Sequence, residues 1–422
     1  MNPMVTTRSL HSHGVASASP LAIHTVTSMR VLVTTESFLP TVNGVTNSVC
    51  KVLEHLERRG HEATVMVPSA GAPATYAGFA VREIPSVPYR QFPVGLPGLH
   101  VQRIIEEFRP DVIHVASPFL LGAEAIASAR RLGVPSVAIF QTDVAGYARR
   151  NHLAAASAIA WKIMRRIHRD ASLTLVPSAA TMADLERVGV ARLGRWGRGV
   201  DLDGFHPRNR RMDAAQLLKT ELSPRGEVVV GYVGRVAPEK QLHKMAALRG
   251  VPGIRIVIVG DGPGMPAVRK ALSGMPVSYL GQLRGEALAA AYASFDLFLH
   301  TGEEETFGQT VQEAHASGLA VVAPRAGGPI DLVDHGIDGF LYDPAAPKEL
   351  RGAVELLARD PALRRRMGEA GRRAVLGRSW ETVCDELLGH YESVIAAAAA
   401  SAATAETLPI LSARERSILK SR

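Results

Sequence analysis

The sequence has few of the residues that cross-link a chain, anchor it in a membrane or stack on bases. Two cysteines, Cys50 and Cys384, occur in 422 residues and no C-x-x-C pair is present, so neither a disulfide framework nor a thiolate metal site is expected. No apolar run approaches the roughly 18 residues of a transmembrane helix. Aromatic residues make up 5% of the chain. The sequence has no convincing basic stripe with exposed aromatic residues, so a nucleic-acid partner is not expected. These absences predict a chain of the reducing cytoplasm, without a membrane span.

Positive charge is in surplus and is unevenly placed. The formal net charge is +8. Residues 29–208 hold 21 Lys and Arg against 15 Asp and Glu, whereas residues 209–395 hold 22 against 23. The first half is therefore expected to face an anionic partner, such as a phosphorylated molecule or a membrane surface, or to carry a solubilising Arg-rich surface.

The hydrophobic pattern predicts two α/β domains. Short, nearly continuous apolar runs alternate with helical stripes, which indicates parallel sheets covered by helices on both faces. The polar segment 207–225 separates two such series, so two doubly wound domains are expected. The strand candidates are Val31–Thr34, Ala63–Val67, Val112–Val115, Ser136–Phe140 and Leu173–Val176, then Val228–Val233, Ile254–Val259, Leu297–His300 and Ala320–Ala323.

Glycine-rich loops follow several of these strands, where such folds bind ligands. Asn43-Gly44 opens a helix and suits an approaching anion. Gly234-Arg235 and Lys240 follow the first strand of the second half and offer two cations for phosphate. Each loop alone is equally compatible with a tight turn or a solvated cation.

The loop Gly260-Asp261-Gly262-Pro263-Gly264 has the spacing G-x-G-x-G, not the G-x-x-G ending of a dinucleotide fingerprint. The spacing therefore favours a glycine turn that lets a helix pack on its strand, rather than a NAD site. A NAD-dependent oxidoreductase is disfavoured for the same reason.

Glu305 and Glu313 are the most informative pair. A helix that starts near Phe307 places Glu305 at its mouth and Glu313 inside it, and eight helical residues rise about 12 Å. That span suits two carboxylates that each bind hydroxyls of a sugar nucleotide. Gly327-Gly328, after the next strand, leaves amides free for a phosphate or sugar oxygen.

In these ordered motifs the chain resembles glycosyltransferase family 4 over about residues 29–395. The resemblance implies the GT-B fold, with two facing Rossmann-like domains and a last helix that crosses back to the first. It also implies retention of anomeric configuration and no metal or other cofactor. The implied organisation is a disordered extension (1–28), an acceptor-binding domain (29–208), a nucleotide-sugar donor-binding domain (209–378), a crossover helix (379–395) and a flexible tail (396–422).

The resemblance also implies roles for individual residues. Arg235 and Lys240 are expected to bind the diphosphate, Glu313 the ribose, and Glu305 the donor sugar. The other expected donor-binding residues are Asn43, Gly44, Gly234, Gly260, Asp261, Gly281, Leu283, Phe307, Gly308, Gly327 and Gly328.

A finer resemblance lies in residues 35–48 and 140–148, which look like actinobacterial GDP-mannose-dependent α-mannosyltransferases. A lipid-linked or glycolipid acceptor is implied. Many relatives carry His where Gln141 stands, so a His-based proton step is in doubt, and Asp143 is a candidate contact to sugar or acceptor. A UDP-sugar-dependent transferase, glucosyl or sulfoquinovosyl to a diacylglycerol-type lipid, is the alternative donor class, and a nucleotide-sugar epimerase the alternative reaction class.

The segment Trp161–Arg169 combines an aromatic, apolar residues and cations at helical spacing. It predicts either peripheral contact with an anionic membrane or an ordinary amphipathic surface helix.

Overall fold

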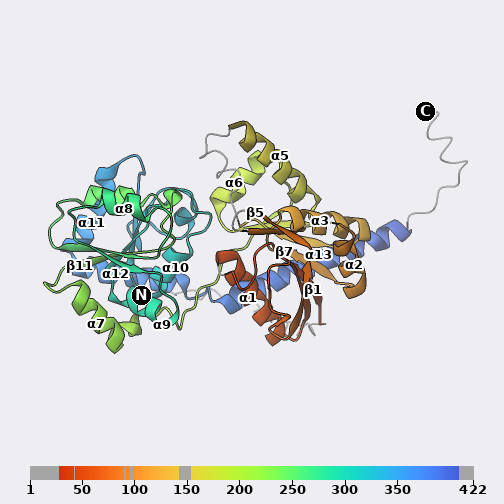
Figure 1. The fold of residues 1–422 in the computed structure, drawn as a ribbon, viewed down its shortest axis with the longest axis horizontal. Coiled ribbons are helices and arrows are strands. Elements are labelled where there is room, and N and C mark those ends of the chain that lie inside the picture. The colour runs from red at the N-terminus through yellow and green to blue at the C-terminus, as the bar shows by residue number, and fades with distance from the viewer. Residues whose placement is uncertain (1–27, 42, 90–91, 96–97, 142–153, 408–422) are drawn as a thin grey trace, which may run out of the picture.

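A computed structural model describes residues 28–41, 43–89, 92–95, 98–141 and 154–407. Asp143 and nearly all of the predicted extension lie outside these residues. Two α/β domains stand side by side, joined by the chain between β10 and α7 and by the long last helix (Figure 1).

The first domain is built on an eight-stranded sheet in the order β10-β9-β8-β7-β1-β2-β4-β3, parallel except for β3. A two-stranded β5-β6 ribbon accompanies it. The strands are β1 (Arg30–Thr34), β2 (Glu62–Pro68), β3 (Thr75–Tyr76), β4 (Phe79–Ile84), β5 (Ser86–Tyr89), β6 (Phe92–Gly95), β7 (Val112–Val115), β8 (Ser136–Ile139), β9 (Leu173–Val176) and β10 (Leu193–Arg195). The helices are α1 (Gly44–Arg58), α2 (Leu99–Phe108), α3 (Leu120–Leu132), α5 (Ala154–Asp170) and α6 (Ala179–Arg187).

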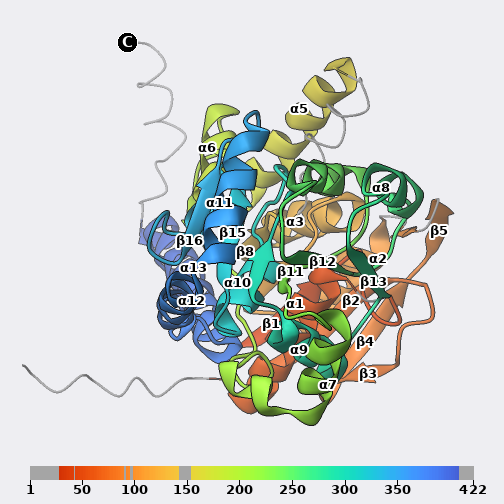
Figure 2. The ribbon, with the colours of Figure 1, turned by 90° about the vertical axis from the view of Figure 1, so that its left-hand side faces the viewer.

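The second domain, which lies at the front in Figure 2, has a six-stranded parallel sheet in the order β13-β12-β11-β14-β15-β16. Its strands are β11 (Val228–Val233), β12 (Ile254–Val259), β13 (Val277–Gly281), β14 (Leu297–Leu299), β15 (Ala320–Pro324) and β16 (Gly339–Tyr342). Its α-helices are α7 (Asp213–Leu222), α8 (Met265–Ala271), α9 (Gly285–Ser294), α10 (Gln309–Ala316), α11 (Pro347–Arg359) and α12 (Pro361–Val375). Short 3-10 helices are η1 (Pro207–Arg211), η2 (Pro238–Lys240), η3 (Leu242–Leu248) and η4 (Gly328–Asp331).

Apolar side chains cover both faces of each sheet, because parallel strands are buried on both sides. In the second domain, one cluster joins the sheet to η3, α8, α11 and α12, and another joins it to α7, α9 and α10. In the first, α2 and α3 cover one face, and α1 and the last helix cover the other. The predicted fold class, two doubly wound parallel-sheet domains, is confirmed.

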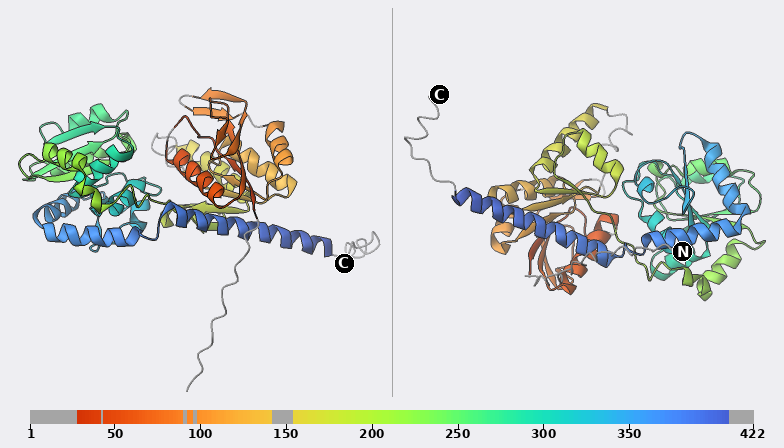
Figure 3. Two further views of the ribbon diagram at one scale, coloured as in Figure 1. Left: turned by 90° about the horizontal axis from the view of Figure 1, so that it is seen from below. Right: turned by 180° about the vertical axis from the view of Figure 1, so that it is seen from behind.

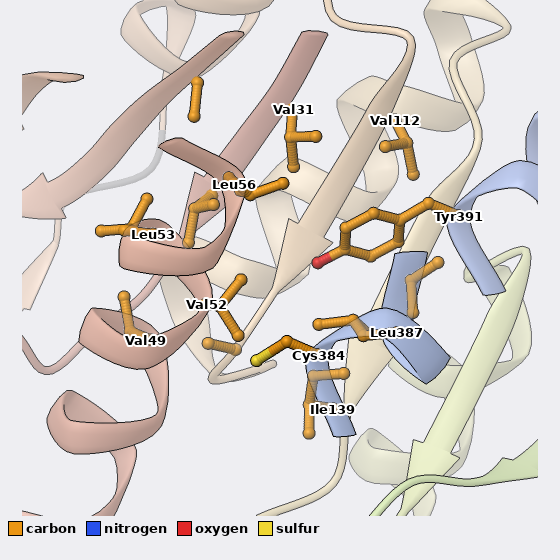
Figure 4. Close-up of a cluster of buried hydrophobic side chains, with 14 of the residues drawn as sticks. Val31, Val49, Val52, Leu53, Leu56, Val112, Ile139, Cys384, Leu387 and Tyr391 are labelled. Carbon is orange, nitrogen blue, oxygen red and sulfur yellow. The ribbon is translucent and has the colours of Figure 1, made fainter. Parts of the chain in front are cut away.

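The last helix, α13 (Trp380–Thr407), leaves the second domain and runs beneath the first (Figure 3). Leu387 and Tyr391 enter the same buried cluster as Val52 and Leu56 of α1 (Figure 4). The indole N–H of Trp196 donates to the carbonyl of Val383 at 2.8 Å. The helix is therefore part of the first domain's core.

One predicted segment differs from the structure. Helix α13 ends at Thr407, so the first residues of the segment 396–422, predicted as a tail, are helical. Alanine has the highest helix propensity, and the alanine run there continues the helix without burial. The polar segment 207–225 contains η1 and α7, whose Ala215 and Leu222 are buried. None of the helices in the described residues is long and apolar enough to cross a bilayer.

Candidate active site

Glu305 and Lys240 meet at the carboxyl edge of the second sheet. Lys240 lies in η2 after β11, and Glu305 lies in the loop between β14 and α10. The Lys240 Nζ donates to Glu305 Oε2 at 2.6 Å, and both side chains are largely buried. The Nε2 of His300 lies 4.0 Å from the same oxygen.

The charge state of Glu305 is set by these neighbours. Burial alone would raise the pKa of its carboxyl, but the Lys240 ammonium, with His300 and Arg198, outweighs burial and lowers the pKa to about 2. Glu305 is therefore a carboxylate at neutral pH, held beside a cation.

Glu313 lies one turn and a half into α10, in different surroundings. Its Oε2 accepts from the Tyr292 hydroxyl at 2.8 Å. Burial raises the pKa of Glu313 to about 7, and the hydrogen bonds from Tyr292 and Gln309 only partly oppose it. Glu313 therefore exchanges between carboxyl and carboxylate near neutral pH.

The glycines after β11 and β12 serve a close approach between two loops. Gly260 has φ of 129°, and a Cβ there would lie 1.9 Å from the Gly234 carbonyl oxygen. A Cβ on Gly262 would lie 2.4 Å from the Val236 oxygen. This packing accounts for the G-x-G-x-G spacing. Asp261 accepts from the Gly262 amide at 2.7 Å, so its carboxylate stiffens the same turn.

Gly327 and Gly328 pack on the loop that carries Glu305. The Gly328 amide donates to the Glu305 carbonyl at 2.6 Å. A Cβ on Gly327 would lie 2.5 Å from that carbonyl, and one on Gly328 would lie 2.2 Å from the Phe307 carbonyl. Phe307 is buried, and Gly308 caps α10 with φ of 102°. The two loops therefore position the Glu305 side chain together.

Three expected donor-binding residues lie at the rim. Arg235 is 65% exposed and pairs with Glu239 within its own loop, without a contact to Lys240 or Glu305. Gly281 ends β13 and accepts from the Gly260 amide at 2.6 Å. Leu283 is half-buried against the α9 side of the sheet.

The first domain contributes Asn43, Gly44 and Gln141. The Asn43 carboxamide oxygen caps α1, accepting from the Val45 and Thr46 amides at 2.9 and 3.0 Å. Gln141 ends the described part of the loop after β8, and its carbonyl lies 3.5 Å from the Thr306 hydroxyl of the second domain. By capping α1, the Asn43 side chain fixes the shape of the loop before that helix.

Arg198 was not among the residues that the sequence singled out. It lies between β10 and η1, and its guanidinium donates to Gln141 Oε1 at 2.7 Å. A Cβ on Gly44 would lie 2.6 Å from its Nη1. No motif marks this position, because the contact joins three segments that are distant in sequence. Within the described part of the chain, no group of three His, Cys, Asp or Glu side chains is placed to hold a metal ion.

Two family descriptions match the chain, one for each domain. Residues 42–203 match Glycosyltransferase Family 4, and residues 214–374 match Glycosyl transferases group 1.

Curated relatives match over most of their length. The chain is 47% identical over 376 residues to a GDP-mannose-dependent alpha-mannosyltransferase of Mycolicibacterium smegmatis, which covers 87% of this chain and 98% of the relative. It is 42% identical to the protein of the same name in Corynebacterium glutamicum, with 87% and 90% covered. Sulfoquinovosyl transferase SQD2 of Arabidopsis thaliana is 35% identical, with 82% and 70% covered.

Solved structures share the fold. Anabaena Alr3699/HepE, in complex with UDP and glucose, superposes with a TM-score of 0.70 at 21% identity, covering 86% of this chain and all of that one. WaaG, a glycosyltransferase involved in lipopolysaccharide biosynthesis, gives a TM-score of 0.64 at 14% identity, with 85% and 98% covered. The expected GT-B architecture is thereby confirmed.

Proposed function

The chain belongs to glycosyltransferase family 4, and from this premise we propose that it transfers a mannosyl residue from GDP-mannose, with retention, to a lipid-linked or glycolipid acceptor. The 47% identity to a GDP-mannose-dependent relative across both domains supports the donor. The observation that carries the chemistry is the buried contact between Lys240 and Glu305 at the carboxyl edge of the second sheet.

The donor would lie along this edge. Glu313 would accept hydrogen bonds from the ribose hydroxyls, and Glu305 from the hydroxyls of the mannose. Gly327 would present its backbone amide, while the Gly328 amide holds the Glu305 loop. Asn43-Gly44 would bring the N-terminus of α1 to the phosphates. The fixed turn at Gly260 shapes the floor beneath the base.

Leaving-group stabilisation is the main chemical task. The diphosphate gains negative charge as the glycosidic bond breaks, and Lys240 and Arg235 would oppose that charge. Arg235 would exchange Glu239 for a phosphate oxygen, which its exposure permits. A donor phosphate oxygen would take the acceptor's proton, since Glu305 is held as an ion pair and Gln141 does not titrate.

The acceptor would approach from the first domain, which carries the charge surplus. On α5, Ile159 and Ile163 are 59% and 54% exposed, beside the exposed cations Lys162 and Arg166. An apolar and basic helix face of this kind supports contact with anionic lipid. Flotation with vesicles that contain or lack phosphatidylglycerol tests it: binding that ignores lipid charge and salt contradicts it.

A UDP-sugar donor is the second candidate, because SQD2 is 35% identical and the HepE structure holds UDP. Thermal denaturation with GDP, UDP, ADP and their sugars separates the two. Stabilisation by GDP and GDP-mannose alone supports the mannosyl donor, and stabilisation by UDP but not GDP would overturn it.

A further inference from the structure

Arg198 is held at the junction of the two domains by its own backbone. Its carbonyl accepts from the Gln312 side-chain amide of α10 at 2.8 Å, and the next carbonyl, of Gly199, accepts from Gln309 at 3.1 Å. A Cβ on Gly199 would lie 2.4 Å from the Cα of Trp380. The segment is therefore fixed against the helix that carries Glu313.

The Arg198 side chain points from this junction into the site. It donates to the neutral Gln141 amide and lies against Gly44, at the N-terminus of α1. Gln141 in turn donates to the Ala116 carbonyl at 3.3 Å, which holds its oxygen toward Arg198. Burial lowers the pKa of Arg198 and the nearby Glu305 carboxylate opposes this, so the guanidinium stays charged.

The charge balance of the site distinguishes Arg198 from the two cations found by motif. Lys240 is paired with Glu305, and Arg235 is paired with Glu239. Arg198 makes no ion pair with any residue that the structure describes. Among these three cations, it is the one without a direct ion pair in the described part of the chain, since the Glu305 charge acts on it from a greater distance.

We propose that Arg198 is a donor-binding residue, and that its guanidinium binds the sugar-linked β-phosphate of the nucleotide between Gly44 and Lys240. The inference rests on the proposed function, since it needs a nucleoside diphosphate at this edge. A planar guanidinium with free N–H groups suits phosphate oxygens, and the α1 N-terminus adds positive potential at the same place.

The β-phosphate makes the assignment testable with two nucleotides. GMP lacks the β-phosphate and GDP has it, so calorimetric Kd values for both measure what Arg198 contributes to that group. In the wild type GDP should bind more tightly than GMP. Arg198→Ala should weaken GDP by about 10- to 100-fold, as expected for a charge-assisted hydrogen bond, and leave GMP within about twofold.

Two further variants complete the experiment. Arg187→Ala removes an exposed arginine on α6 that pairs with Asp184 at 2.7 Å, and it should change neither Kd. Arg198→Lys keeps the positive charge but not the planar guanidinium with its several N–H donors. It should therefore recover part of the affinity for GDP that Arg198→Ala loses. If Arg198→Ala does not fold, Arg198→Lys and Arg198→Gln provide the same comparison.

Two results would overturn the inference, and a third would overturn the proposed function. If Arg198→Ala weakened the binding of GDP and GMP equally, Arg198 would have a role in domain arrangement only. Unchanged GDP binding with a raised acceptor KM would place it on the acceptor. A wild type that binds neither nucleotide would instead overturn the proposed function.

Discussion

Two buried carboxylates eight positions apart have opposite electrostatic surroundings. Glu305 faces Lys240, and its pKa is lowered to about 2. Glu313 faces Tyr292 and apolar groups, and its pKa is raised to about 7. Local neighbours thus give the same residue type two charge states, because a paired cation favours the ion and uncompensated burial favours the acid.

This difference predicts pH-dependent donor binding. Only the carboxylate of Glu313 can accept hydrogen bonds from both ribose hydroxyls, and this form is lost as the pH falls through about 7. GDP-mannose should bind about tenfold more weakly at pH 6 than at pH 8. The diphosphate of GDP-mannose is esterified at both ends, so the ligand does not titrate in this range.

Calorimetry over this range measures the effect, with Glu313→Gln as the comparison. The glutamine keeps one accepting oxygen but carries no ionisable proton. Its profile should be flat, with affinity reduced at pH 8. A wild-type profile as flat as that of the variant would contradict the role of Glu313.

A second residue-scale prediction concerns Lys240. Lys240→Ala removes the cation beside Glu305 and one stabilising charge on the leaving group, so kcat should fall by about 10²- to 10³-fold. Lys244→Ala is the matched control: Lys244 also lies near β11, is 22% exposed like Lys240, and pairs with Glu303. Steady-state rates should be nearly unchanged for the control, and equal losses would contradict a specific role for Lys240.

The residues of the site were predictable where a local pattern carries them. The eight-residue spacing of Glu305 and Glu313 and the paired glycines after β15 follow from strand–loop–helix repeats. Arg198 was not predictable, because its place depends on a link that folds back on α10 and reaches Gln141. The pairing of Arg235 with Glu239 also could not be predicted from the sequence.

At the scale of elements, strands buried on both faces were the most predictable. β7, β9, β11 and β12 have the bounds that their apolar runs indicate. β13 and β16 were missed: β13 is only half-buried at the sheet edge, and β16 is a short run between glycine and aspartate. β4, with its charged and exposed positions, has no apolar run to mark it.

The loop packing at Gly260 gives a prediction for an element boundary. Gly260→Ala places a methyl group 1.9 Å from the Gly234 carbonyl, so the loop after β11 must shift. Gly250→Ala is the control, since Gly250 has φ of 77° but no atom within 4 Å of the added Cβ. The control should lose only about 1–2 kcal/mol of unfolding free energy for the left-handed backbone.

Urea denaturation and GDP binding measured together test this. Gly260→Ala should lose more stability than the control and also bind GDP more weakly, whereas Gly250→Ala should bind GDP normally. Identical behaviour of the two variants would contradict the close-approach argument.

The two parts of α13 should differ in their contribution to stability. One face of the helix from Val383 to Val394 is buried in the first domain's core, but residues 396–404 are exposed or half-buried. Deletion of residues 396–422 should therefore shift the Tm little. Leu387→Ala, which leaves a cavity in the core, should cost about 2–5 kcal/mol. A truncation that destabilises as much as Leu387→Ala would contradict this division.

At the scale of the whole molecule, the links that join the domains include α13, the segment around Arg198, the contact of Thr306 with Gln141, and a contact of η4. Asp331 of η4 accepts from the Ala179 amide at 2.6 Å and from Arg195 at 2.8 Å. The segment around Arg198 and η4, which begins at Gly328, adjoin residues of the proposed site. The proposed site is therefore shared between the domains, with the carboxylates on one side and Gly44 and Gln141 on the other.

The distribution of charge agrees with this division of labour. The second half is close to neutral because it holds nearly equal numbers of cationic and acidic residues. Its cations Lys240 and Arg235 are each paired with a carboxylate. The excess of the first half lies partly on the exposed face of α5, where the proposed membrane contact would use it.

The central claim is that this shared site takes a guanine nucleotide carrying mannose. Calorimetric titration of one protein preparation with GDP-mannose, UDP-glucose and UDP-sulfoquinovose compares the donors directly, without an acceptor. GDP-mannose should bind at least about tenfold more tightly than either UDP-sugar, a difference of about 1.4 kcal/mol. A UDP-sugar that binds as tightly as GDP-mannose, or more tightly, would contradict it.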